Sequence, residues 1–186
     1  MQMPIVVENP TYPAVSLEEA KKHLDVVGFK DDDEQIAGLI SAATEHLEKT
    51  LGICLRKTKF QQNSGSFFGP HKILIYPVIN IDRIELVLEN GSKATLPRDK
   101  YELFTTHDST YVYYKDEQPK LAKQPDAVKI FFTAGFEQDQ IPATLKTAIL
   151  LHCASLYENR EDLSITKPAT TGAYDALILP WRRPAV

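Results

Sequence analysis

The sequence predicts an α+β fold: a helical bundle of two long helices plus short N- and C-terminal helices, with an inserted small antiparallel β lobe. Apolar residues recur at helical spacing towards both ends of the chain, whereas the middle alternates with strand period and is broken by Gly, Pro and Asn turns. A length of 186 residues fits one domain carrying a lobe. We therefore expect a single domain over residues 1–186, with a helical body at 14–52 and 140–181 and the β lobe at about 53–135.

The first expected helix follows a proline-rich segment, Asn9 to Pro13. Each proline fixes its own φ and disfavours helix at the residue before it, so this segment is expected to be extended. Ser16 and Glu19 then form a capping-box pattern, in which each side chain satisfies the other residue's backbone N–H. A short helix is predicted from there to about Leu24, ending before Gly28.

The second helix begins at the acidic run Asp31–Glu34, because negative charge stabilises the positive end of a helix dipole. Its apolar stripe at helical spacing consists of Ile36, Leu39, Ile40, Ala43 and Leu47. Gly52 is expected to end it, since glycine readily adopts the left-handed conformation that terminates helices.

The β lobe is predicted from short runs rich in β-branched and aromatic residues. The expected strands are Lys57–Gln62, Lys72–Tyr76, Ile81–Leu88, Tyr101–Phe104, Thr110–Tyr114 and Ala127–Thr133. Asn90-Gly91 separates the third of these from residues 93–96, and both residues tolerate the positive φ of a tight turn. A hairpin is therefore expected there.

The last long helix is expected from Pro142, which suits a first helical turn because its missing N–H would be unpaired there. Residues 145–157 are apolar over most of the helix circumference, which predicts burial against the helix containing Ile36 and Leu47. The following segment, Ser164–Gly172, is expected to be a mobile loop, and a short element is expected over Tyr174–Leu179.

Composition and motifs exclude several classes of function. A net charge of −4 does not gather nucleic acid, and no apolar run reaches the length of a membrane helix. The five histidines are scattered outside any metal-binding or catalytic pattern, so no enzyme activity, metal or cofactor is expected. Cys54 and Cys153 lack a C-x-x-C pairing and are expected to be buried packing residues in a reducing cytoplasm.

The one local cluster of basic and aromatic residues is Trp181-Arg182-Arg183. Such residues are enriched at the energetic centres of protein interfaces. An equally simple interpretation is a packed tryptophan beside two solvated arginines. Lys167 and Tyr174 complete the set of candidate interface residues.

Several segments, in their order along the chain, resemble the head-tail connector, or head-completion adaptor, family of long-tailed phages and prophages. They are Pro13–Lys21 with His23-Leu24, the acidic start of the Ile36–Leu51 helix, Leu74–Ile81, Val128–Phe136, Ile141-Pro142, Tyr157–Glu161 and Leu179–Pro184. The resemblance spans about residues 12–184. The family's usual ending has tyrosine at the position of Trp181.

The resemblance implies a virion structural protein without catalytic residues. Its copies would form a ring, dodecameric in the virion, that docks on the portal and joins the DNA-filled head to the tail. Its partners would be the portal, the next connector or tail protein, and DNA that passes through the lumen without sequence-specific binding; no membrane is involved. We expect it in the virion, and in the bacterial host cytoplasm during assembly.

A ring has consequences for the protomer. It closes through heterologous contacts, in which one face meets a different face of the neighbour. The helices would form its body and the β lobe would project from it. Residues 1–13 and 163–172 are expected to become ordered on assembly.

Two alternatives are open at this level. The runner-up to the connector is an α+β binding module, or another tail-assembly protein that does not form a ring. A small cytoplasmic hydrolase or transferase requires a convergent polar pocket that these residues do not assemble.

Overall fold

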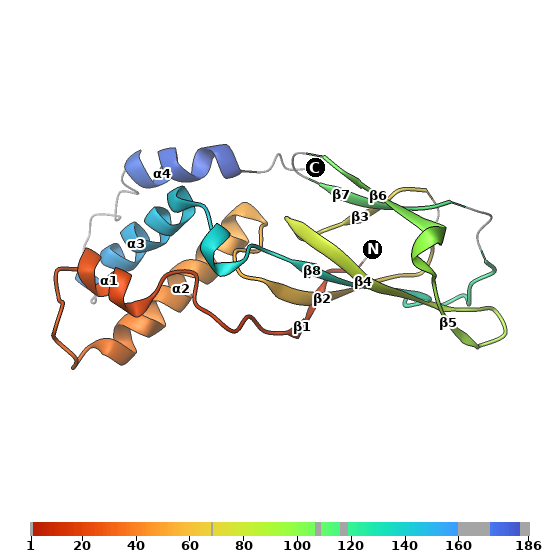
Figure 1. Ribbon diagram of the computed structural model, residues 1–186, viewed down its shortest axis with the longest axis horizontal. Coiled ribbons are helices and arrows are strands. Elements are labelled where there is room, and N and C mark those ends of the chain that lie inside the picture. The colour runs from red at the N-terminus through yellow and green to blue at the C-terminus, as the bar shows by residue number, and fades with distance from the viewer. Residues whose placement is uncertain (1, 68, 107–108, 116–118, 160–171, 183–186) are drawn as a thin grey trace. The chain divides into compact units, whose positions relative to one another are not determined.

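The structure is a computed structural model with a mixed α+β fold (Figure 1). It describes residues 2–67, 69–106, 109–115, 119–159 and 172–182. Within these residues there are four α-helices and two antiparallel sheets, which confirms the predicted α+β class. The chain divides into two compact units. We call residues 1–10 with 56–136 the β unit, and residues 11–55 with 137–186 the helical unit.

The helical unit begins with α1 (Leu17–His23), and its capping box is confirmed. The Glu19 N–H donates to Ser16 Oγ at 3.1 Å, and the Ser16 N–H donates to Glu19 Oε2 at 2.8 Å. The backbone hydrogen bond from Ser16 lowers the pKa of the Glu19 carboxyl. The second helix, α2 (Asp33–Leu51), ends as predicted at Gly52, which has a φ of 64°.

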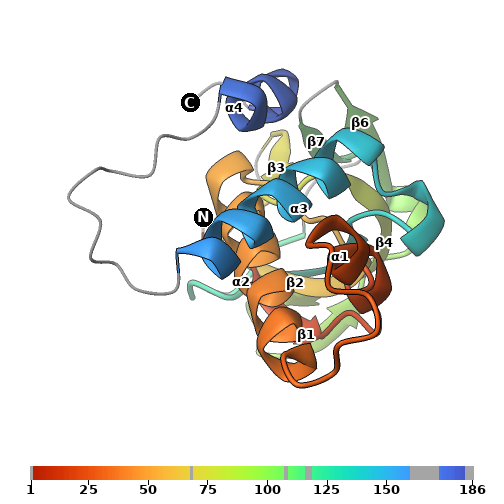
Figure 2. The ribbon, with the colours of Figure 1, turned by 90° about the vertical axis from the view of Figure 1, so that its left-hand side faces the viewer.

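The helix α3 (Ala143–Glu158) packs on α2 (Figure 2), which confirms the expected burial of its apolar side. Pro142 is the N-cap of this helix instead of its first residue. At the other end of α3, the Tyr157 hydroxyl donates to Asp32 Oδ2 at 2.6 Å, just before α2 begins. A single turn of 3-10 helix (Gln138–Gln140) precedes α3. Because apolar residues line both helices, the core of the helical unit lies between them.

The β unit contains two antiparallel sheets. The five-stranded sheet has the order β1 (Ile5–Glu8), β2 (Thr58–Ser64), β8 (Val128–Ala134), β4 (Val78–Val87) and β5 (Lys93–Thr95). The three-stranded sheet has the order β3 (His71–Ile73), β7 (Thr110–Tyr114) and β6 (Tyr101–Thr105), and a 3-10 turn (Arg98–Lys100) leads into β6. The hairpin predicted at Asn90-Gly91 is confirmed, since β4 pairs with β5 and Gly91 has a φ of 79°.

Two elements of the β unit differ from the sequence prediction. The strand β1 was not expected, because prolines flank its four residues and its pairing with β2 is a long-range contact. The strand β3 ends at Ile73, whereas the sequence predicted a strand to Tyr76. The Gln62 side chain explains this difference: it accepts from the Leu74 N–H at 3.0 Å and so takes a backbone group that a neighbouring strand would otherwise pair.

The two faces of the five-stranded sheet are unlike. One face buries apolar side chains, including Phe60 and Phe132, whose rings stack with centroids 5.5 Å apart. The other face, which we call the outer face, carries charged and polar side chains from β1, β2, β8 and β4. This alternation follows from the two-residue period of a strand.

Candidate interaction surfaces

The predicted C-terminal cluster lies on α4 (Gly172–Ile178) and the 3-10 turn Leu179–Trp181, which pack against α3. Ile178 and Tyr174 face into the helical unit and are 1% and 7% exposed. Leu179, on the other side, is 64% exposed. The segment therefore has a buried side that fixes it to α3 and an open side available to a partner.

Tyr174 packs against His152, which in turn stacks on His46. Its ring centroid lies 5.8 Å from that of His152, which stacks on His46 at 4.8 Å with an interplanar angle of 6°. The Tyr174 hydroxyl is buried and has no hydrogen-bond partner among the residues that the structure describes. Burial raises the pKa of this hydroxyl. Tyr174 is thus a packing residue of the helical unit, and its place at an interface stays a prediction.

Trp181 and Arg182 lie closer to solvent. The Trp181 Nε1–H donates to Thr144 Oγ1 at 3.2 Å, which ties the indole to the first turn of α3. Arg182 pairs with Asp175 at 3.2 Å, and both of these side chains are about half exposed. The structure therefore brings Trp181, Arg182 and Tyr174 together on one short segment. Lys167 and Arg183 lie outside the described residues.

The stack of His152 on His46 predicts that the stability of the protein depends on pH. Burial, and then the nearby His46, lowers the pKa of His152 from its usual 6.5. In the folded state His152 therefore takes up its proton at a lower pH than in the unfolded chain, so the free energy of unfolding falls as pH drops through about 6.5. We expect His152→Phe, which keeps an aromatic ring there, to reduce the change in thermal midpoint between pH 7.5 and 5.5; part of the change remains, because burial also lowers the pKa of His71. His23→Phe, at an exposed position, should leave that change as it is in the wild type.

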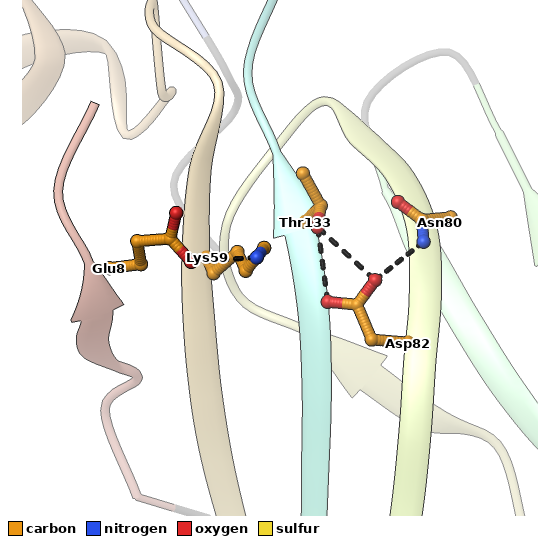
Figure 3. Close-up of polar contacts among 5 residues, drawn as sticks. All are labelled: Glu8, Lys59, Asn80, Asp82 and Thr133. Carbon is orange, nitrogen blue, oxygen red and sulfur yellow. Dashed lines mark hydrogen bonds and ion pairs between the residues drawn. The ribbon is translucent and has the colours of Figure 1, made fainter. Parts of the chain in front are cut away.

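The outer face of the five-stranded sheet is a second candidate surface (Figure 3). Asp82 on β4 accepts from the Thr133 hydroxyl at 3.0 and 3.3 Å and from Asn80 Nδ2 at 2.6 Å. On the neighbouring strands, Lys59 of β2 pairs with Glu8 of β1 at 2.6 Å. Four strands thus contribute to one row of polar side chains.

A β-bulge shapes this face. The register between β4 and β8 shifts between Ile81 and Arg83, so Asp82 is the extra residue. A bulge lets two consecutive side chains point to the same side of a sheet. Asp82 accordingly contacts Thr133, while the Arg83 guanidinium lies 3.6 Å from the centroid of the Phe131 ring.

The charges on the outer face alternate in sign. Glu8, through its hydrogen bond and its charge, raises the pKa of Lys59. Arg83 pairs with Glu85 at 2.7 Å, and Lys129 pairs with Asp126 at 3.2 Å. Exposed pairs of this kind contribute little to stability. They do define a pattern of charge that a partner surface must complement.

The Asp82 carboxylate and the two cysteine thiols are either paired or buried. The Asp82 carboxylate already accepts hydrogen bonds from a hydroxyl and an amide, so its oxygens are engaged within the sheet. Cys54 and Cys153 are buried free thiols, as predicted, and burial raises the pKa of Cys153. In the described part of the chain, no group of three or more His, Cys, Asp and Glu could hold a metal ion. None of the described helices is both long enough and apolar enough to cross a membrane.

Sequence reasoning did not identify the outer face. The alternation of polar and apolar residues in Thr58–Ser64 indicates a strand with one polar side, and this signal was available. The bulge at Asp82 and the addition of β1 depend on pairing between distant segments, so local patterns could not show which charged residues would share a face.

Residues 14–76, which span α1, α2, β2 and β3, match the model of the family described as phage gp6-like head-tail connector protein. No curated protein sequence matches the chain.

Solved structures match nearly the whole chain. A chain from the virion of the native gene transfer agent particle has a TM-score of 0.82 and 22% identity, covering 100% of this chain and 97% of that one. A chain from the neck of the empty particle, computed with C6 symmetry, has a TM-score of 0.83 and 23% identity with the same coverage. A chain from the neck of the native particle, computed with C12 symmetry, has a TM-score of 0.75 and 23% identity, covering 98% and 97%. At these identities, the matches show a shared fold.

The fold match covers both units, and the family match covers the segment in which the capping box, α2 and the first strands of the β lobe were predicted. The resemblance of this chain to the phage head-tail connector family, which the sequence predicted, is thereby confirmed.

Proposed function

We propose that this protein is a virion structural protein, a head-tail connector whose copies form a ring that docks on the portal and joins the DNA-filled head to the tail. The observation that carries the proposal is the match of nearly the whole fold to a chain from a particle neck computed with C12 symmetry. The family match over residues 14–76 supports it independently. The C12 symmetry of that neck supports a dodecameric ring in the virion.

In this proposal the chain acts as one connector domain over residues 1–186. The helices at 14–52 and 140–181 form the helical bundle that is the body of the ring, and the β lobe at about 53–135 projects from it. The strand β1, near the N-terminus, pairs with β2 and so joins this lobe. An insertion between packed helices disturbs the body least when it lies at the surface.

The described surfaces suit such an assembly. A closed ring requires two different faces on each copy. The outer face offers alternating charges on a rigid sheet, and the open side of the C-terminal segment offers Leu179, Trp181 and Arg182. Two candidate faces with different chemistry are therefore present on one protomer. Lys167, Tyr174 and Arg183 stay candidate interface residues.

The proposed partners are other copies of the chain, the portal protein, and the next connector or tail protein. DNA would pass through the lumen without sequence-specific binding, and a net charge of −4 agrees with weak contact to it. The protein would act in the virion, after assembly in the host cytoplasm. Its role would be structural and not enzymatic.

The direct test is the mass of the protein by light scattering over a wide concentration range, with and without the cognate portal. The proposal expects growth to a large discrete ring, or co-migration with the portal. A monomer at every concentration that does not bind the portal would contradict it. That outcome would instead favour an α+β binding module or another tail-assembly protein.

The C-terminal cluster gives a second test. Trp181→Ala combined with Arg182→Ala removes the aromatic and basic groups nearest to solvent. If they form an interface centre, the concentration at which rings form should rise about tenfold or more. The control is Glu45→Ala with Lys49→Ala, an exposed pair on α2. Unchanged assembly at unchanged thermal stability would remove Trp181 and Arg182 from the interface.

A further inference from the structure

The strand β1 has the properties of an arm that can be exchanged between copies. All four of its residues are exposed, and Ile5, Val6 and Val7 are 55%, 52% and 54% exposed. An edge strand with apolar side chains and no cover on either side is uncommon in a protein that works alone, because it invites pairing with another chain. The exposed apolar side chains of β1 contribute little to the stability of the monomer, which suggests that they serve an interaction with another chain.

The attachment of β1 to its own sheet consists of a backbone ladder and an exposed ion pair. It pairs with β2 through the backbone, with Val6 opposite Phe60 and Glu8 beside Lys59. The ion pair between Glu8 and Lys59 at 2.6 Å is exposed, so it fixes the register more than it adds stability. Because no side chain of β1 is buried, releasing the strand requires no opening of the core.

The connection of β1 to the rest of the chain also fits an arm. Residues 9–13 join it to the helical unit and contain Pro10 and Pro13. Prolines keep such a segment extended, and five residues span roughly 17 Å. The strand β2, which pairs with β1, begins only at Thr58, after two helices, so β1 and its acceptor strand are separate segments of the sequence.

We propose that in the assembled ring each copy lays β1 on the β2 edge of the next copy, in the register that β1 has on its own β2. This inference rests on the proposed ring. The occupant of the edge is a second copy of this chain, because the complementarity of β1 for β2 is already present in the structure: the same hydrogen-bond ladder and the same Glu8–Lys59 pair form again between molecules.

The energetics favour exchange only on assembly. The ladder lost within one copy is regained between copies, so the exchange itself is nearly neutral. In a ring, each arm lies close to its neighbour's edge, and this high effective concentration favours the intermolecular pairing. A head-to-tail series of arms is also a heterologous contact, which is the type that closes a ring.

The test uses cysteines at the paired positions Glu8 and Lys59. One variant carries Glu8→Cys, a second carries Lys59→Cys with a tag that changes its mass, and neither can form this disulfide within one chain. The two are mixed as monomers, concentrated until rings form, oxidised mildly and run on a denaturing gel without reductant. In a closed ring that forms at random from equal amounts of the two variants, a disulfide needs the Glu8→Cys copy as donor of the arm and the Lys59→Cys copy as its acceptor. Exchange therefore predicts a disulfide-linked heterodimer at about a quarter of the arm contacts. Each variant alone controls for other pairings, including those of Cys54 and Cys153.

The double variant, Glu8→Cys with Lys59→Cys in one chain, separates the two proposals. Exchange predicts a ladder of covalent multimers that reaches the mass of the ring measured before denaturation. Rings that form while the disulfide closes only within each chain, with no heterodimer in the mixture, would overturn the exchange and leave the ring intact. If light scattering shows no ring at any concentration and the disulfide again closes only within each chain, both proposals fail.

Discussion

Replacing Gly135 with alanine is expected to destabilise the β unit strongly. Gly135 has a φ of 108°, a conformation that side chains with a Cβ rarely adopt. A Cβ there would lie 2.3 Å from the Arg56 carbonyl oxygen and 2.9 Å from the Lys57 nitrogen. Both are backbone atoms and cannot turn away as a flexible side chain would. The strain and the clash together should cost roughly 3–5 kcal/mol, a large fraction of the stability of a typical domain.

The close approach at Gly135 has a clear structural role. The Gly135 N–H donates to the Pro77 carbonyl at 2.9 Å, and the Lys57 N–H donates to the Phe136 carbonyl at 3.1 Å. The segment that enters β2 and the segment that leaves β8 therefore run side by side where both connect to the helical unit. A residue larger than glycine would push these two segments apart.

Chemical denaturation with circular dichroism would measure the effect of Gly135→Ala. Gly91→Ala is the matched control, because Gly91 also has a positive φ, 79°, but no atom lies within 4 Å of a Cβ built there. It should cost only about 1 kcal/mol, from backbone strain alone. Equal losses in the two variants would show that the contact with Arg56 and Lys57 has no energetic weight.

The second large effect is expected for Gln62→Leu. Gln62 is fully buried, and its side-chain amide donates to the Lys72 carbonyl at 2.9 Å and lies 3.2 Å from His71 Nε2. Its carbonyl oxygen accepts from the Leu74 N–H. Leucine fills a similar volume but cannot make these hydrogen bonds to part-buried backbone groups, and each lost bond costs about 1–3 kcal/mol. We expect the variant to lose roughly 3 kcal/mol and to release β3 from the sheet it joins.

Amide hydrogen exchange in residues 71–74, together with the denaturation midpoint, would test the role of Gln62. Gln61→Leu provides a control on the adjacent residue, whose side chain lies on the outer face and contacts Asn63. That variant should change stability by less than about 1 kcal/mol. If both variants unfold at the same denaturant concentration, then Gln62 does not hold β3 in place.

The comparison of Gln61 and Gln62 shows what limits a prediction from sequence. Both are polar residues in a predicted strand, and the alternation pattern assigns them to opposite faces. The pattern favours an apolar residue on the buried face. Gln62 is there because its side chain forms hydrogen bonds with backbone groups of Lys72 and Leu74 at the end of β3. These groups come close to β2 only when the two sheets are assembled.

Tyr174 and Trp181 show the same limit at the candidate site. They were predicted together from composition near the end of the chain, and the structure does place both on one segment. Their environments differ, since Tyr174 packs against His152 while Trp181 reaches Thr144 near solvent. Burial depends on which side of α4 meets α3, and a helix of seven residues has too short a pattern to show that.

The sequence by itself determined the local structure of this protein. The capping box at Ser16, the left-handed end of α2 at Gly52, the buried side of α3 and the turn at Gly91 depend on residues a few positions apart, whose preferences act within a few bonds. The order of the segments also indicated a resemblance to the connector family, and residues 14–76 match the model of that family.

Only the tertiary structure decided which distant segments meet. It added β1 to the edge of β2, moved Asp82 and Arg83 to one face through a bulge, and ended β3 at the Gln62 side chain. Each of these features pairs backbone groups that are far apart in the chain. The free energy of such pairing comes from satisfying buried hydrogen bonds across strands, and no short sequence pattern records which partner will satisfy them.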